Sequence, residues 1–295
     1  MSLNVTVIGL GSMGYGMALS CLRAGYRVLG QDVAPERAAQ FVSDGGVAEP
    51  MDNPDAVVVV VLNAQQTESV LFGADGAVPH LRKGTVVISC ATVPPDFARE
   101  MEQRCAEHGV YYLDAPISGG SVKAAAGKLS VMASGNAEAF SAAEPILDAT
   151  AETVFRLGDA AGAGSAMKAV NQLLAGVHIA AMAEAMTFGM TQGITPQRFL
   201  DVISKCAGTS WMLENRAPHI VAGDYTPHSQ VNIWPKDLGI VLDTAEATGF
   251  DAPITQAALG QYRKAVEIGL GHEDDAAVAK VYAHASGLDL PGEDA

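Results

Sequence analysis

A single lysine interrupts one of the most apolar stretches of the sequence. Lys168 lies near the start of "GSAMKAVNQLLAGVHIAAMAEAM", residues 164–186, and Asn171 follows three residues later. Residues three apart share one face of a helix, and an amine beside an amide suits proton exchange with a substrate hydroxyl that the amide orients. Because an unpaired buried ammonium is costly, Lys168 lies either on a solvated face or beside a group that requires it.

A glycine-rich motif near the N-terminus predicts a dinucleotide site. In "VIGLGSMGYGMA" the glycines have the spacing GxGxxG, between a predicted strand and a predicted helix. This spacing permits a tight turn and close approach of a pyrophosphate to the helix N-terminus. Asp32 ends the second apolar run, where such units place an acidic residue on the adenosine ribose. The expected cofactor-binding residues here are Gly9, Leu10, Gly11, Ser12, Met13, Gly14 and Asp32.

The acidic residue also bears on the choice of cofactor. Asp32 would repel a 2′-phosphate, and Val33 stands where an arginine would bind one. We therefore expect NAD rather than NADP. A glycine turn without a ligand, followed by a solvated Asp32, is the alternative.

A third motif combines small residues with positive charge. In "LDAPISGGSVKAAAGKLSVMASG", Ser118, Gly119 and Gly120 follow a predicted strand, at the edge where open α/β sheets bind ligands. A hydroxyl and accessible backbone N–H groups suit a carboxylate, and Lys123 adds positive charge. We expect these four residues to bind an anionic substrate; an ordinary Ser/Gly turn is the alternative.

The elements that position these residues follow from the hydrophobic pattern. Short runs rich in β-branched residues predict strands: "NVTVIG", "YRVLGQD", "AVVVVVL", "GTVVISC", "VYYLDAP", "KLSVMAS" and "TVFRLG". Helix-like stretches lie between most of them: 13–24, 35–42, 94–107 and 137–149. Only helices are expected afterwards: 165–192, 196–205, 211–221, 236–248, 254–269 and about 274–283. We predict a doubly wound, mainly parallel Rossmann domain (1–162) followed by an all-helical domain (163–295).

Composition narrows the classes of partner. The chain of 295 residues has a formal net charge of −15, which argues against nucleic acid. Its four cysteines are widely spaced, without a CxxC pair, so neither a disulfide framework nor a metal site is expected. The N-terminus lacks the features of a signal peptide, and the apolar run 173–190 contains His178 and Glu184. We therefore expect a cytoplasmic protein whose apolar run forms a central helix.

Together these motifs resemble the β-hydroxyacid dehydrogenase family, which includes 3-hydroxyisobutyrate dehydrogenases and tartronate semialdehyde reductases. The resemblance covers essentially the whole chain and is carried by "GLGSMGYGMA", "DAPISGGSVKAAAGKLSVMASG", "GAGSAMKAVNQ" and "KDLGIVLDTA". It implies that Lys168 is the catalytic residue in a cleft between the two domains, and that Asn171 joins Ser118, Gly119 and Gly120 in holding substrate. The further cofactor contacts that it implies are Leu62, Asn63, Thr92 and Lys236. One departure is "SCATVPP", where Cys90 and Ala91 replace small hydroxyl residues, although Thr92 is retained.

Within the family, "NQLLAGVHIAAMAEAM", "SWMLENR", "GDYTPHS" and "EDDAAV" are most similar to the branch that oxidises the C2 hydroxyl of L-threonate with NAD. Several polar or aromatic side chains are candidates to bind the additional sugar-acid hydroxyls: His178, Trp211, Asn215, Arg216 and His228. Core packing or a surface ion pair is the alternative role for each.

Three other functions stay open from the sequence. Tartronate semialdehyde reduction or 3-hydroxyisobutyrate oxidation would use the same catalytic residues, whereas the imine reductase branch generally lacks the lysine and favours NADPH. A noncatalytic dinucleotide-binding or assembly module is the alternative from another class. The long apolar helix also predicts a homodimer or homotetramer, since exposed apolar surface of that extent favours association.

Overall fold

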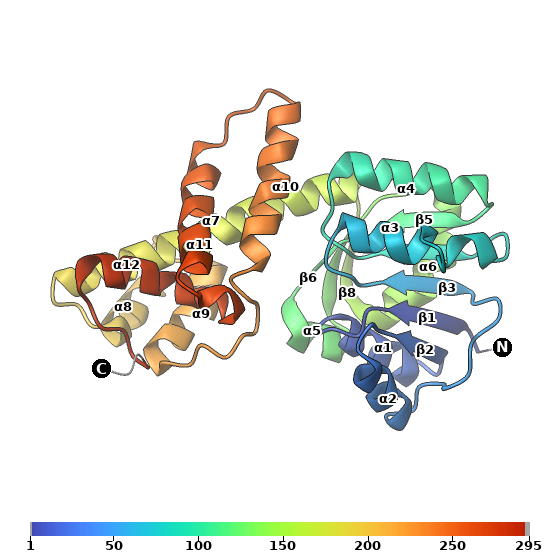
Figure 1. Cartoon of the computed structure of the whole chain (residues 1–295), viewed down its shortest axis with the longest axis horizontal. Coiled ribbons are helices and arrows are strands. Elements are labelled where there is room, and N and C mark those ends of the chain that lie inside the picture. Colours follow the sequence, from blue (N-terminus) through green and yellow to red (C-terminus); the bar gives the residue numbers. More distant parts are fainter. Residues whose placement is uncertain (1, 293–295) are drawn as a thin grey trace. The chain divides into compact units, whose positions relative to one another are not determined.

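The computed structural model describes residues 2–292, and the chain divides into two units, Met1–Lys168 and Ala169–Ala295. The division falls within one long helix, α7 (Ala163–Thr191), so the chain passes from the first unit to the second without a linker. Figure 1 labels α7 along this continuous helix. Each unit has its own apolar core and is described separately below.

The first unit is built on a parallel sheet of five strands in the order β2-β1-β3-β4-β5. The strands are β1 (Asn4–Ile8), β2 (Arg27–Gln31), β3 (Ala56–Val59), β4 (Val86–Ser89) and β5 (Tyr111–Asp114). Strand β1 is central to the fold, since Val5 pairs with Val28 on one side and with Ala56 on the other. The predicted α/β class is confirmed.

Helices cover both faces of this sheet, which explains why the inner strands β3 and β4 are buried at every position. The helices of the unit, before α7, are α1 (Gly14–Arg23), α2 (Pro35–Ser43), α3 (Ala64–Phe72), α4 (Pro95–Glu107), α5 (Gly120–Ala126) and α6 (Ala137–Thr150), with the 3₁₀ turn η1 (Val78–His80). One core packs Met17 of α1 and Phe140 of α6 against the sheet, and the other packs Leu71 of α3 and Met101 of α4. Burial of each such side chain contributes about 1.5–3 kcal/mol.

The last two predicted strands form a second, smaller sheet. Its three strands are β6 (Ile117–Ser118), β7 (Leu129–Ala133) and β8 (Ala151–Arg156), with β6 antiparallel to β7 and β7 parallel to β8. A single bridge, between Asp114 and Ser134, connects β5 to the segment after β7. The sequence pattern predicts β7 and β8 but neither the two-residue strand β6 nor this division, because apolar periodicity contains no information about which strand pairs with which.

Glycine at position 16 brings helix α1 against helix α5. A Cβ built on Gly16 would lie 2.6 Å from the backbone nitrogen of Ala125, so a larger residue would push the helices apart. The hydroxyl of Ser20 then donates to the carbonyl of Ala124 at 3.1 Å. The helix that follows the glycine-rich turn therefore packs directly on α5, the helix that begins within the Ser118–Lys123 segment.

The second unit is helical, as predicted, with no strand named between residues 169 and 292. After α7 come α8 (Pro196–Ile203), α9 (Trp211–Ala222), α10 (Ile233–Ala247), α11 (Pro253–Glu267) and α12 (Val278–Ser286), with short 3₁₀ turns η2 (Leu270–His272) and η3 (Asp275–Ala277) before α12. Helix α7 has the length and hydropathy of a membrane span, and it is the one helix in the described part of the chain that does. Its Ile179, Met182 and Met186 are nevertheless core residues of this unit, packed with Trp234 and Tyr262.

A buried carboxylate holds the start of α7 against the sheet. Asp114, at the end of β5, accepts hydrogen bonds on Oδ2 from the backbone nitrogens of Gly162 (2.9 Å) and Ser165 (2.8 Å). Its Oδ1 accepts from the hydroxyl of Ser165 at 2.7 Å, and Ser134 donates to Oδ2 at 3.2 Å. Burial raises the pKa of Asp114 above its ordinary value, and these hydrogen bonds oppose that rise. A negative charge at a helix N-terminus is also favourable to the helix dipole.

We predict that Asp114→Ala destabilises the first unit by about 2–4 kcal/mol, because the donors of Gly162, Ser165 and Ser134 all lose their acceptor. Asp114→Asn should lose less, since its carbonyl can still accept from the two backbone groups. Hydrogen exchange of peptides from residues 1–168 and urea unfolding measure the loss, with the exposed Asp159→Ala as the control. Equal stability of Asp114→Ala and the control would contradict this role.

Candidate functional site

The glycine-rich turn has the close packing that its sequence predicts. Gly9 has φ +95°, and a Cβ on it would lie 2.3 Å from the carbonyl oxygen of Val60. A Cβ on Gly14 would lie 1.9 Å from the carbonyl oxygen of Gly9. Gly11 differs, because its nearest neighbour would be the Arg37 guanidinium at 4.0 Å. Gly9 and Gly14 thus build the turn, whereas Gly11 leaves room beside it.

The helix that follows this turn begins without a side-chain cap. Met13 is the N-cap residue of α1 and makes no capping hydrogen bond. By contrast, the side chains of Asn63, Asn136 and Ser210 cap α3, α6 and α9. The first N–H groups of a helix have no partner within it, so the start of α1, next to the exposed Ser12, suits a phosphate group. The residues present therefore fit a dinucleotide.

Asp32 is tied to the same turn. Its Oδ2 accepts from the backbone nitrogen of Leu10 at 2.7 Å, and its Oδ1 accepts from that of Ala34 at 2.9 Å. These bonds fix a carboxylate that is only 6% exposed beside the glycine-rich turn. Lone pairs not used by the two backbone groups can still accept from ribose hydroxyls.

The other expected cofactor contacts follow neighbouring strands. Leu62 and Asn63 come after β3, where Asn63 accepts from the backbone nitrogen of Gln66 at 2.9 Å and the Leu62 side chain is exposed. Thr92 comes after β4 and is half-buried. Because β1, β3 and β4 are adjacent and parallel, these residues lie at the carboxyl edge of the sheet with the glycine-rich turn.

Cys90 and Ala91, which stand where the resembled family has small hydroxyl residues, belong to the core rather than to this edge of the sheet. Cys90 and Ala91 are both buried apolar residues. Burial raises the pKa of Cys90 to about 12, so its thiol stays protonated at neutral pH. The missing hydroxyls therefore leave the exposed part of the edge unchanged.

The segment that joins β6 to α5 has an unusual backbone. Gly119 has φ +133° and Gly120 has φ +76°, conformations that L side chains rarely adopt. The Lys123 side chain packs over Gly119, since a Cβ there would lie 2.9 Å from Cδ of Lys123. Its ammonium is 4.0 Å from Glu152 of β8, and both side chains are exposed. Lys123 thus stays beside the segment as a solvated cation.

Lys168 is brought to this same segment. Its Nζ donates a hydrogen bond of 2.8 Å to the carbonyl oxygen of Ile117, the residue before Ser118. The lysine is only 8% exposed and lies one helical turn beyond Ser165, which Asp114 holds. The structure therefore rules out the solvated-face alternative and places the amine next to Ser118.

A second group of polar side chains joins Asn171 to Lys236 within the helical unit. Nδ2 of Asn171 donates to Oε1 of Gln172 at 2.9 Å, and Nε2 of Gln172 donates to Oδ2 of Asp237. The Lys236 ammonium is 2.6 Å from Oδ1 of Asp237. Gln172 and Asp237 were not among the sequence candidates, although both lie directly beside one in "VNQ" and "PKD".

Two candidate sugar-acid contacts of the helical unit bind each other, since Asn215 accepts a hydrogen bond from Arg216. Arg216, predicted to contact substrate or to form a surface ion pair, is instead buried and paired with Asp275. Nε1 of Trp234 donates to the same carboxylate at 3.0 Å, so this ion pair belongs to the core. Trp211 is 60% exposed, and the ring of His228 is tilted against that of His219, with centroids 4.9 Å apart.

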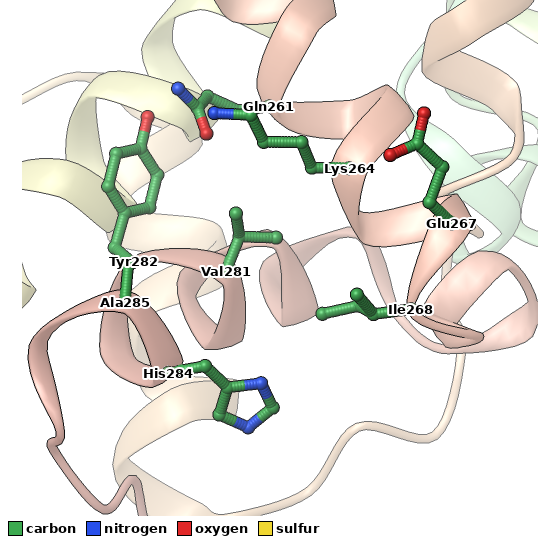
Figure 2. Close-up of a pocket in the computed structure, with 8 residues that line it drawn as sticks. All are labelled: Gln261, Lys264, Glu267, Ile268, Val281, Tyr282, His284 and Ala285. Carbon is green, nitrogen blue, oxygen red and sulfur yellow. The ribbon is translucent and has the colours of Figure 1, made fainter.

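A cavity of about 390 Å³ lies between α11 and α12 (Figure 2). It is lined by Gln261, Lys264, Glu267, Ile268, Val281, Tyr282, His284 and Ala285. None of these residues was predicted to bind substrate or cofactor. The cavity therefore shares no lining residue with the candidate site.

Two family models match the chain, one for each part. Residues 4–158 match the NAD binding domain of 6-phosphogluconate dehydrogenase. Residues 162–282 match the NAD-binding domain of NADP-dependent 3-hydroxyisobutyrate dehydrogenase. Together the two matches cover the glycine-rich turn, the Ser118–Gly120 segment, Lys168 and Lys236.

Full-length relatives agree with these matches. An L-threonate dehydrogenase from Cupriavidus necator is 52% identical over 298 residues, which cover 99% of each chain. One from Escherichia coli (strain K12) is 46% identical, over 98% of this chain and 97% of the relative. The crystal structure of a 3-hydroxyisobutyrate dehydrogenase from Salmonella typhimurium has a TM-score of 0.90 at 45% identity, covering 95% of this chain and all of the other.

We predict that Gln172→Glu destabilises the helical unit, because it places a second carboxylate against buried Asp237. Repulsion between the two carboxylates raises the pKa of the pair in the folded state. The folded state of the variant therefore binds more protons than the unfolded state, and its free energy of unfolding falls as the pH rises. The loss in the free energy of unfolding should be greater at pH 8 than at pH 5, by about 1–3 kcal/mol. Urea unfolding followed by tryptophan fluorescence reports on this unit, which contains Trp211 and Trp234.

Gln256→Glu is the matched control for this variant, since Gln256 is exposed in the first turn of α11, where a carboxylate is favourable. A pH-independent loss in Gln172→Glu, equal to that of the control, would contradict the contact with Asp237.

Proposed function

Because this chain belongs to the 3-hydroxyisobutyrate dehydrogenase-like family of NAD(P)-dependent hydroxyacid dehydrogenases, we propose that it oxidises the C2 hydroxyl of L-threonate to the 2-oxo acid with NAD. The observation that carries the proposal is the hydrogen bond from Lys168 to the Ile117 carbonyl, which holds a buried amine beside Ser118. The names of the full-length relatives from Cupriavidus necator and Escherichia coli support L-threonate as the substrate.

In this proposal the Ser118–Gly120 segment binds the substrate carboxylate. The Ser118 hydroxyl and the backbone N–H groups of Gly119 and Gly120 donate to its oxygens, and Lys123 adds positive charge nearby. Positive φ at both glycines supports this role, because it turns consecutive peptide groups in directions that an ordinary turn does not reach. Local donors thus favour an anion despite the net charge of −15.

Lys168 accepts the proton of the C2 hydroxyl as the carbonyl forms. The neutral amine takes the proton, the O–H electron pair becomes the new C=O bond, and hydrogen leaves C2 with its electron pair. Asn171, three residues later in α7, lies on the same helix face and orients the hydroxyl. Bound NAD supplies the electron acceptor, the nicotinamide ring.

The proposal also includes NAD rather than NADP. Asp32 supports this choice, since a fixed carboxylate at the ribose repels a 2′-phosphate. The cytoplasmic location and the dimer or tetramer expected from the sequence stay predictions.

A substrate panel tests the proposed reaction. NADH or NADPH formation is measured with L-threonate, D-threonate, D-erythronate, D-glycerate and 3-hydroxyisobutyrate. Preference for L-threonate with NAD is the expected result. Preference for another acid would overturn the substrate assignment, and no turnover with any acid would favour the noncatalytic alternative.

We predict that Lys168→Ala lowers kcat by at least about 10²-fold, because proton transfer by a positioned side chain contributes about 10²–10⁴-fold. NADH binding, followed by fluorescence titration, should stay within about threefold of the original protein. Lys128→Ala, at an exposed lysine of the same unit, is the control and should keep its activity. Near-normal turnover of Lys168→Ala would exclude the lysine from the mechanism.

A further inference from the structure

A buried glutamine of the helical unit, Gln172, connects Asn171 to a buried carboxylate. Its Oε1 accepts a hydrogen bond of 2.9 Å from Nδ2 of Asn171, and its Nε2 donates to Oδ2 of Asp237. Asp237 is buried as well, and the Lys236 ammonium is 2.6 Å from its other oxygen, Oδ1. Both polar ends of the Gln172 side chain are therefore engaged.

The charge of Asp237 determines which way the Gln172 amide faces. An ionised carboxylate, here beside the Lys236 ammonium, can only accept hydrogen bonds. The NH₂ end of Gln172 must therefore face Asp237, and its oxygen must face Asn171. Two oxygens placed together would repel each other, so Nδ2 rather than Oδ1 of Asn171 faces Gln172. The orientation of both amides thus follows from the carboxylate.

Close packing of α10 on α7 holds these groups together. Gly176 lies one helical turn after Gln172, and a Cβ built on it would lie 2.8 Å from Cε3 of Trp234 and 2.9 Å from Cδ2 of Leu238. Asp237 directly precedes Leu238, so the close approach at Gly176 also brings its carboxylate to Gln172. The contact between Gln172 and Asp237 is therefore part of the packed core.

The orientation of the Asn171 amide matters because a side-chain amide keeps nearly the same shape when it rotates by 180°, whereas its donor and acceptor exchange places. Asn171 is half-buried. Its Nδ2 has one N–H on Gln172 and a second N–H that is not used there, and Oδ1 takes the opposite direction. A rotated amide would turn a lone pair toward a substrate atom that requires an N–H. Fixing the amide before substrate binds avoids that mismatch.

We propose that Gln172 is a positioning residue for the dehydrogenase reaction, which fixes the Asn171 amide in the orientation that suits the substrate hydroxyl. This inference rests on the proposed function, since Asn171 orients the C2 hydroxyl there. Gln172 makes no contact with substrate and acts only through Asn171. Asp237 acts one step further away, because it fixes the amide of Gln172.

A double-mutant cycle tests whether Gln172 acts through Asn171. The value of kcat/KM is measured at saturating NAD, with the acid that the substrate panel prefers, for the original protein, Gln172→Met, Asn171→Ala and the double variant. Methionine keeps the length of the side chain but removes both hydrogen bonds. Gln172→Met should lower kcat/KM at least about tenfold when Asn171 is present, and by less than about twofold in the Asn171→Ala background. Equal losses in the two backgrounds would overturn the positioning role.

Gln192→Met is the matched control, because Gln192 is an exposed glutamine directly after α7. It should keep the kcat/KM of the original protein. NADH binding by Gln172→Met, followed by fluorescence titration, should stay within about threefold of the original protein. A larger loss of NADH binding would assign the effect to Lys236 and the coenzyme, and would overturn the proposal.

Two further measurements keep the test decisive. Circular dichroism shows whether Gln172→Met folds; if it does not, the cycle is repeated with Asp237→Asn, since an amide there can donate as well as accept and no longer fixes Gln172. Calorimetric binding of L-threonate to the NADH complex, which cannot turn over, extends the cycle to variants without measurable activity. The same dependence on Asn171 is expected in both measurements, and losses independent of Asn171 would overturn the role of Gln172 alone. Absence of turnover with every acid of the panel would overturn the proposed function itself.

Discussion

The carboxylate of Asp114 is the constraint on which the rest of the site depends. A buried charge of this kind is costly, and it is stabilised here by the backbone nitrogens of Gly162 and Ser165 and by two hydroxyls. Gly162 directly precedes α7 and Ser165 lies in its first turn, so bonds that satisfy the carboxylate also hold the start of the helix. Lys168 follows Ser165 by one turn, and its amine consequently reaches the carbonyl of Ile117.

Three aspartates perform different tasks because their surroundings differ. Asp114 is enclosed by donors and anchors a helix, whereas Asp32 is tied to two backbone groups and keeps lone pairs available at the edge of the sheet. Asp237, in the helical unit, contacts Gln172 and Lys236, and through Gln172 it connects Lys236 to Asn171. Residue type alone does not distinguish these roles; burial and hydrogen-bond partners do.

Much of the fold and part of the site follow from the sequence. The alternation of apolar runs predicts the α/β unit and the helical unit that follows it. The GxGxxG spacing predicts the tight turn in which Gly9 and Gly14 pack closely, and the family match over residues 4–158 confirms a dinucleotide-binding domain. The family resemblance is confirmed by the full-length relatives. Each of these signals is local, or repeats with a short period along the chain.

The features that the sequence did not predict depend on tertiary contacts. Helices α3 and α5 were not predicted, because they are too short to show a clear helical period. The division into two sheets depends on which strands pair with each other. Arg216 is buried only because Asp275, far along the chain, provides its partner. Arg37 reaches Asp32 only through the turn before α2. No periodic pattern in the sequence predicts such long-range contacts. The residues that set substrate and cofactor specificity are therefore harder to predict than the location of the site.

The most direct test of the account follows the hydrogen that leaves the substrate. The protein is given NAD and L-threonate deuterated at C2 or at C3, and the mass of the NADH is determined. The account predicts deuterium in NADH from the C2-labelled substrate, with a primary isotope effect on the rate of NADH formation when chemistry limits it. Deuterium that reaches NADH from C3 instead would contradict oxidation at the C2 hydroxyl beside Lys168.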